Sequence, residues 1–254
     1  MAANAQRRDR LWVAAALASV IALSWWYLVR TARDMYGAMD GPAAWMMAGT
    51  WDAAYFALMC GMWAAMMAGM MLPSAAPTVL LYGAVLRNGD AQAPTAARSS
   101  AFAAGYLLAW TGFSVAATLL QWALANTALL SPMMESTRPW LDATILIAAG
   151  VYQWTPLKRN CLSLCRAPVD FISHHWRNGA GGALLMGLHH GLYCVGCCWV
   201  LMLLLFVGGV MNLAWIAAIS TVVLLEKLVP LGEQGGRAGG VLLVAAGLWV
   251  LLKN

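Results

Sequence analysis

The side chains best suited to bind a metal ion are concentrated in one part of this 254-residue sequence. All four histidines and five of the six cysteines lie between Cys161 and Cys198. If the stretch 186–198 is helical, at about 100° per residue, four ligand-type side chains share one face. They are Met186, His190, Cys194 and Cys197. His189 and Cys198 lie just beyond its two edges. Imidazole and thiol groups are ligands of soft transition metals, so the spacing predicts a metal site.

The apolar surroundings of this stretch strengthen the prediction. Imidazole and thiol groups cost free energy in lipid unless they have a partner, and a metal ion satisfies both at once. The alternative is that the cysteines act as small apolar side chains in a packed core. A disulfide between Cys194 and Cys198 is a poor explanation, because residues one helical turn apart project side by side in a strained geometry.

A second stripe of soft ligands precedes the first. Met59, Met62, Met66 and Met70 recur at spacings of three and four, which places them on one helix face. Thioethers favour Cu(I) over zinc, so we expect copper, with zinc or another transition metal as alternatives. Methionine also fills gaps in apolar cores, and packing is an equally good explanation of this stripe.

Two further cysteines lie in a basic segment. Cys161 and Cys165 are four residues apart, so one helical turn would let them bind an ion together. Flanking basic residues would favour their thiolate form. The segment 158–176 mixes apolar and polar residues at helical spacing, which predicts an interfacial amphipathic hairpin. Incidental thiols in such a hairpin are the alternative.

Glu226 is an acidic residue deep in an apolar run, where carboxylates frequently serve as proton or ion partners. We expect it either to balance charge at the metal site or to form a salt bridge at a helix end beside Lys227. Asn212 is expected to cap a helix or to reach an ion. The sequence contains no P-loop, dinucleotide-binding, serine-hydrolase or zinc-protease motif, and it predicts no catalytic residue.

The composition indicates which kind of secondary structure carries these candidate ligands. With 62% hydrophobic and 10% charged residues, the chain is excluded from the soluble globular enzymes and from the disordered, collagen-like and nucleic-acid-reading classes. The net charge of +5 comes from basic residues between apolar segments, where they contact membrane lipid. We predict an all-α polytopic transmembrane bundle of about seven helices.

The expected spans are residues 11–29, 51–72 with an extension to 86, 101–124, 141–154, 182–210, 213–229 and 240–252. Pro73 and Pro77 predict a kink or a break in the second span. Residues 88–95 and 131–139 are expected to be loops. The distribution of basic residues predicts a multi-pass protein of the bacterial inner membrane with a cytoplasmic N-terminus.

Two parts of the chain are distinguished by these patterns. Residues 1–44 are expected to form a retained signal-anchor helix and a loop. Residues 45–254 are expected to form the metal-binding membrane domain.

Three runs carry a resemblance to a known family. They are 71–77 (MLPSAAP), 152–158 (YQWTPLK) with the cysteines and CRAP that follow, and 190–212 with the pair at 226–227. Together they resemble prokaryotic proteins described as predicted metal-binding integral membrane proteins of unknown function, over roughly residues 45–252. The resemblance implies a membrane metal site at the 71–77 run and at His190, Cys194, Cys197, Cys198, Cys161 and Cys165. It implies no reaction, and we match neither Cys60 nor His189 to a family position.

Three functions fit these observations. The first is a copper-binding protein that moves the ion across the membrane or delivers it to a metal-accepting protein or membrane complex. In this first function, the four methionines form a path of weak ligands, and His190, Cys194 and Cys197 form the tight site. The second is a membrane oxidoreductase with a metal or cysteine redox site. The third is a structural subunit of a membrane complex.

Overall fold

Helices make up the regular structure in the described part of the chain. The computed structural model describes residues 2–37, 46, 50–89, 95–229 and 232–253. Within these ranges the strand-like pairing is limited to an isolated bridge between Leu130 and Ser136. The predicted all-α class is therefore confirmed.

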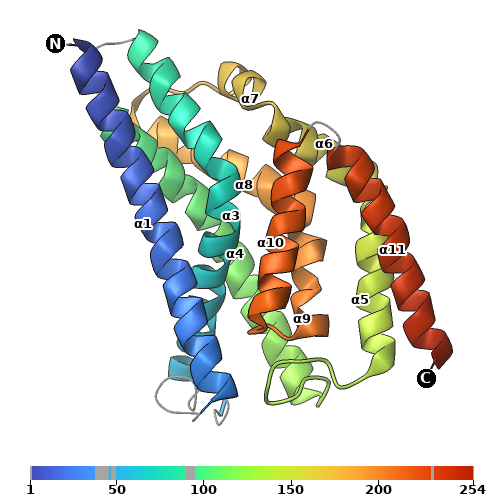
Figure 1. Ribbon diagram of the computed structural model, residues 1–254. Helices are drawn as coiled ribbons and strands as arrows, with labels where there is room; N and C mark the ends of the chain where they lie inside the picture. The colour runs from blue at the N-terminus through green and yellow to red at the C-terminus, as the bar shows by residue number, and fades with distance from the viewer. Residues whose placement is uncertain (1, 38–45, 47–49, 90–94, 230–231, 254) are drawn as a thin grey trace.

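The long helices lie side by side, and consecutive ones run in opposite directions (Figure 1). They are α1 (Ala2–Tyr36), α3 (Ala53–Gly89), α4 (Thr95–Asn126), α5 (Pro139–Tyr152), α8 (Gly179–Leu203), α10 (Leu213–Leu228) and α11 (Gly232–Lys253). The short helices α6 (Pro156–Arg166) and α7 (Pro168–His174) lie at the end of the bundle that holds the N-terminus. The one-turn helix α9 (Leu205–Gly208) lies near the opposite end.

Five helical stretches of the described chain are long and apolar enough to cross a membrane. They are Arg8–Tyr36, Ala53–Arg87, Thr95–Asn126, Gly179–Gly208 and Gln234–Lys253. Helices α5 and α10 have 14 and 16 residues. At 1.5 Å per residue they measure about 21 and about 24 Å, less than the about 30 Å of a hydrocarbon core. The count of seven spans therefore stays a prediction.

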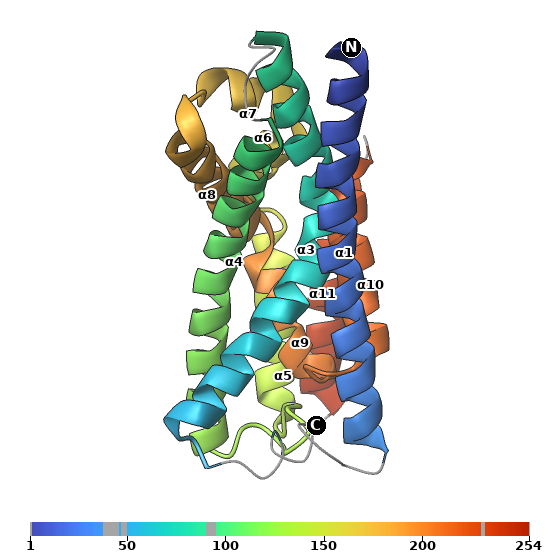
Figure 2. The same cartoon turned by 90° about the vertical axis from the view of Figure 1, so that its left-hand side faces the viewer.

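Helix α3 is continuous through its two prolines, Pro73 and Pro77. Of the two expected outcomes, the break is absent, and the helix changes direction along its length (Figure 2). Because Pro73 has no N–H, the carbonyl oxygen of Gly69 loses its helical donor. The indole nitrogen of Trp25 in α1 donates to this oxygen at 3.2 Å. A donor from a neighbouring helix thus satisfies the carbonyl that the proline leaves free.

Helix α1 packs into the same core as the rest of the bundle. Its Leu28 and Met35 are buried in one cluster with the methionines of α3, and Asp9 pairs with Arg87 at the far end of α3. The boundary predicted between residues 44 and 45 lies outside the described residues. The signal-anchor role of this helix stays a prediction.

Glycines bring α4 and α8 into backbone contact. A Cβ atom on Gly187 of α8 would lie 1.9 Å from the carbonyl oxygen of Phe102, and one on Gly105 of α4 would lie 1.9 Å from that of Leu184. Small residues allow such close approach between helices in membranes. The contact places Tyr106 of α4 against the cysteine-bearing face of α8.

The segment predicted as an amphipathic hairpin forms α6 and α7. Each begins with a proline in its first turn, and the Thr155 hydroxyl accepts a hydrogen bond from the Lys158 backbone N–H at the start of α6. The apolar side chains Leu162 and Phe171 are buried, and α6 packs on α8. Residues 131–138 are non-helical as expected. Of the other predicted loop, residues 88, 89 and 95 are helical and 90–94 lie outside the described residues.

Candidate metal centre

Four thiols converge where α6 packs against α8. Cys165 comes from α6, and Cys194, Cys197 and Cys198 come from α8; we call these four residues the thiol cluster. The thiols of Cys165, Cys197 and Cys198 all lie within interaction distance of the Cys194 thiol. Hydrogen bonds with Cys194 and Cys197 raise the pKa of the Cys165 thiol well above its usual range. The stripe predicted on one helix and a thiol predicted on another therefore meet.

The spacing within α8 explains three members of the cluster. Cys197 and Cys198 follow Cys194 by three and four residues, so each of them neighbours Cys194 on the surface of the helix. Each is 1% exposed. Cys198 was expected just beyond the edge of the face that carries Cys194 and Cys197, but it is buried with these two cysteines. The neighbouring helices cover a wider arc of α8 than the predicted stripe.

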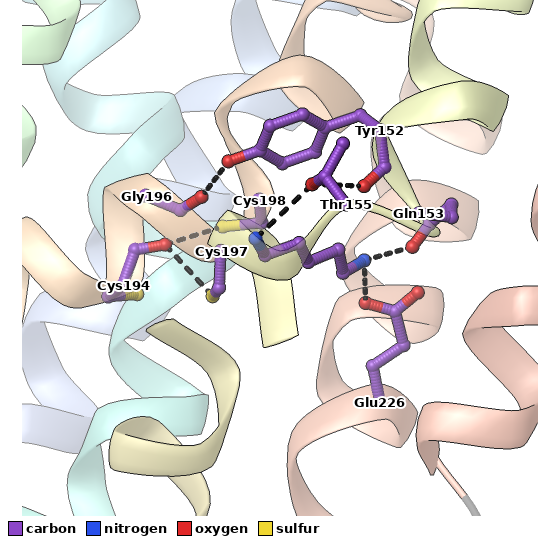
Figure 3. A network of polar contacts seen from close by, with 9 residues as sticks. Tyr152, Gln153, Thr155, Cys194, Gly196, Cys197, Cys198 and Glu226 are labelled. Atoms are coloured by element: carbon purple, nitrogen blue, oxygen red, sulfur yellow. Dashed lines mark hydrogen bonds and ion pairs between the residues drawn. The ribbon is translucent and has the colours of Figure 1, made fainter. Parts of the chain in front are cut away.

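The thiol hydrogens of two members point to the backbone. Cys197 and Cys198 donate to the carbonyl oxygen of Cys194 at 3.1 and 3.0 Å (Figure 3). In the described ranges no three His, Cys, Asp or Glu side chains are already arranged to hold a metal ion. Binding an ion would therefore require these thiols to rotate away from the carbonyl. A thiol is a weak hydrogen-bond donor, so the rotation gives up little.

Lys227 of α10 is the cationic partner of the cluster. Its ammonium group lies 2.8 Å from the sulfur of Cys194 and 3.2 Å from the hydroxyl oxygen of Ser74. The residue is 7% exposed. A buried ammonium group requires a charged or strongly polar partner, and a nearby ammonium favours the thiolate form of a cysteine. Cys194 is therefore the thiol best prepared to bind a cation.

Tyr106 of α4 completes the surroundings of Cys194. Its hydroxyl oxygen lies 3.0 Å from the Cys194 sulfur and 3.1 Å from the carbonyl oxygen of Met71, which begins the MLPSAAP run of α3. Tyr106 is not predicted by any motif of the sequence, and Lys227 was expected only at a helix end. An ammonium group in an apolar run was an available signal for Lys227, whereas a tyrosine in an apolar helix is ordinary.

His190 lies close to the cluster and is 3% exposed. Its ring is surrounded by aromatic rings, with centroids 5.0 Å from Phe171 and 5.9 Å from Tyr106. Its Nδ1 atom has no hydrogen-bond partner among the described residues. A buried polar atom without a partner is rare in proteins, so this nitrogen is available to a ligand.

Cys161 lies at the edge of the thiol cluster, where it is partly exposed. A Cβ atom on Gly196 would lie 2.8 Å from its sulfur, so the glycine leaves room for this thiol beside α8. The hydroxyl of Tyr152 donates to the carbonyl oxygen of Gly196 and fixes α5 at the same point. Burial raises the pKa of the Cys161 thiol, and the charge of Cys197 adds to that rise.

Comparison with known protein families matches residues 60–250 to the PpoB2 family of copper chaperones. The chain belongs to this family. The matched range contains every member of the thiol cluster together with Lys227, Tyr106 and His190. Family membership supports copper as the metal handled by the chain, in agreement with the predicted metal-binding resemblance. No curated protein and no solved structure matches the chain.

The methionine face of α3, formed by Met59, Met62, Met66 and Met70, is buried as its spacing predicts. Each of the four is at most 2% exposed, and all belong to the main apolar core. The Met59 sulfur accepts a hydrogen bond from the Gln121 side-chain amide at 3.6 Å. Burial is expected of both packing and ligating methionines, so copper binding by this face stays a prediction.

Glu226 pairs with a residue outside the cluster. Its carboxylate lies 2.7 Å from the ammonium group of Lys158, which also donates to Gln153 (Figure 3). The helix-end pair with Lys227 is not formed, because successive residues of a helix point in different directions. Metal binding by Glu226 stays a prediction, but Lys158 already balances its charge. Asn212 caps α10 by accepting a hydrogen bond from the backbone N–H of Trp215.

Proposed function

We propose that this protein is a membrane-embedded copper chaperone that holds Cu(I) at the thiol cluster and delivers it to a metal-accepting protein. One observation carries the proposal: a buried ammonium group, that of Lys227, touches one of four converging thiols. Membership of a copper chaperone family supports the choice of metal. Thiolates select soft ions such as Cu(I), so the ligand chemistry and the family agree.

The charges of the site favour a copper dithiolate. One Cu(I) ion bound by two thiolates carries a net charge of −1, which is costly to bury without a counter-charge. The ammonium group of Lys227 supplies the opposite charge beside Cys194. Before copper arrives, the same group balances a single thiolate. We therefore propose Cys194 as the first ligand, another thiol of the cluster as the second, and Lys227 rather than Glu226 as the charge-balancing residue.

We assign secondary roles in copper binding to the other predicted ligands. Cys161 lies at the exposed edge of the cluster, where an ion would arrive or leave. His190 offers a buried nitrogen close by. The methionine face is proposed as a path of weak thioether donors leading toward the cluster. Residues 45–254 are proposed as the copper-binding part of the chain.

The proposed location is the bacterial inner membrane, with several spans and a cytoplasmic N-terminus. The five long apolar helices support membrane insertion. Helix α6, which carries Cys165, lies at the end of the bundle that holds the N-terminus (Figure 1). With that orientation, the α6 side of the thiol cluster faces the cytoplasm in this proposal.

Cu(I) binding to detergent-purified protein, in competition with a chromogenic Cu(I) chelator, tests the proposal. The Cys194→Ser and Cys197→Ser double variant is expected to lose the tightly bound ion. The Cys60→Ser variant is the matched control, because Cys60 lies on α3 outside the cluster, and it should retain the ion. Equal copper content in wild type and the double variant contradicts the proposal.

A further inference from the structure

Two histidines, one directly after α7 and one in α8, lie close together near the thiol cluster. The rings of His175, directly after α7, and His189 of α8 have centroids 6.4 Å apart and planes at 73°. Both residues are partly exposed. Fourteen residues separate them in the sequence, so their proximity results from the way α7 folds back on α8. Neither is needed at the thiol cluster.

The ring of His175 is held in a way that suits a metal ligand. Its Nδ1 atom lies 3.1 Å from the carbonyl oxygen of Phe171, and the ring stacks on that of Phe171 at 4.7 Å. A carbonyl oxygen only accepts hydrogen bonds, so Nδ1 carries the hydrogen and Nε2 keeps its lone pair. Metal-binding histidines usually donate their second ring N–H to a carbonyl or carboxylate in this way.

The distance between the two ring centroids leaves room for one ion, once a ring nitrogen of each histidine is turned toward the other. A ring nitrogen lies about 1.1 Å from its centroid and a metal–nitrogen bond is about 2 Å, so two imidazoles in line with an ion have centroids about 6.2 Å apart. The observed separation is 6.4 Å. A linear two-coordinate ion leaves each ring free to rotate about the bond axis, so the angle of 73° between the planes is no obstacle.

We propose that His175 and His189 form a second Cu(I) site on the surface of the protein, through which copper passes to or from the thiol cluster; the transfer role rests on the proposed chaperone function. Cu(I) accepts two imidazole ligands, and a site with only two donors releases its ion readily to a stronger one. His189 precedes Cys194 by five residues, about 7.5 Å along the helix axis. An ion held by the pair is therefore close to the thiols.

Removal of the thiol site isolates the histidine site. The Cys194→Ser and Cys197→Ser variant is titrated with Cu(I) alone and is expected to keep one weaker equivalent. That equivalent should be lost in both His175→Phe and His189→Phe made in this background. His174→Phe is the matched control, because His174 is exposed and its Nδ1 contacts the carbonyl oxygen of Asp170 at 2.8 Å. X-ray absorption of the retained copper should show two nitrogen neighbours and no sulfur.

Three outcomes overturn this inference. They are the absence of a second equivalent, its survival in both histidine variants, and its equal loss in His174→Phe. His175→Gln and His189→Gln, which keep polar side chains, replace any phenylalanine variant that fails to fold by circular dichroism. Failure of the proposed function gives a different result, because the cysteine variant then keeps all the copper of the wild type whether or not the histidines bind an ion.

Discussion

The methionine face of α3 and the thiol cluster of α6 and α8 are both stripes of sulfur-containing side chains buried in the same bundle. Their surroundings differ. The methionines lie in an apolar core, where the Met59 sulfur accepts a hydrogen bond from the Gln121 side chain. Cys194 instead touches an ammonium group from α10 and a hydroxyl group from α4.

Soft ligands that share one helix face can therefore lie in very different electrostatic surroundings. A thioether is neutral and stable in an apolar core, so a buried methionine needs no charged or hydrogen-bonding partner. A buried thiolate requires a counter-charge, and the structure supplies one from another helix. Charge partners therefore distinguish a prepared site from packing more clearly than ligand spacing does.

The largest effect on stability is expected from breaking the ion pair between Lys158 of α6 and Glu226 of α10. Lys158→Met leaves the buried carboxylate of Glu226 unpaired and is expected to cost about 3–5 kcal/mol of unfolding free energy. The double variant Lys158→Met with Glu226→Leu should recover most of that loss, because no charge is left buried. Equilibrium unfolding in mixed micelles measures both. Equal losses in the single and double variants would contradict the assignment.

The second-largest effect is expected where the α8 backbone contacts α4, a contact that the start of α3 does not make at Gly61. Gly187→Ala in α8 places a methyl group against the carbonyl oxygen of Phe102 and is expected to cost about 1–3 kcal/mol. Gly61→Ala in α3 is the matched control, because a Cβ atom there meets nothing within 4 Å. We expect that control to unfold like the wild type or to be slightly more stable. Similar destabilisation of both variants would remove this difference between the regions.

Removing the ammonium group of Lys227 should leave the thiol cluster without a counter-charge, as the methionine face is. Lys227→Met is expected to weaken Cu(I) binding at least about tenfold, equivalent to about 1.4 kcal/mol, because the copper dithiolate loses its counter-charge. Lys227→Arg preserves the charge and should retain more of the affinity. Chelator competition measures both variants. Unchanged affinity in Lys227→Met would show that the cation plays no part in holding copper.

The smallest expected effect lies on the methionine face. Met62→Leu with Met66→Leu conserves volume, so unfolding should change by less than about 1.5 kcal/mol per site and the bound copper at equilibrium should be unchanged. If these thioethers form a path to the cluster, stopped-flow loading of Cu(I) will be slower than in the wild type. Equal loading rates would assign the face to packing alone.

Much of the fold follows from local pattern. Apolar runs predict the long helices, and helical spacing predicts that the methionines and the α8 cysteines share buried faces. Of the kink or break expected at Pro73, the break is absent, and Trp25 on a separate helix donates to the carbonyl oxygen that the proline leaves without a donor. Two expected spans are shorter than a hydrocarbon core, since α5 and α10 have only 14 and 16 residues.

The candidate site was predicted only in part. Cys194 and Cys197 share one buried helix face as their spacing predicts. Cys165 was expected to act with Cys161, and it joins them only because α6 packs on α8, whereas Cys198 lies in the cluster rather than beyond its edge. Glu226 pairs with Lys158 of α6 and not with its neighbour Lys227, because residue 226 faces α6 while residue 227 faces α8. Sequence spacing fixes directions around one helix but not which helix lies opposite.

The sequence by itself determined the helical class and the helix faces that carry sulfur and imidazole groups, because a fixed rotation per residue relates spacing to direction. Tertiary structure alone decided which of those groups acquire a charged partner. Lys227 and Tyr106 are 33 and 88 residues from Cys194 along the chain, yet both touch its sulfur. Contacts over such separations depend on the packing of whole helices, here on glycines that bring α4 and α8 together.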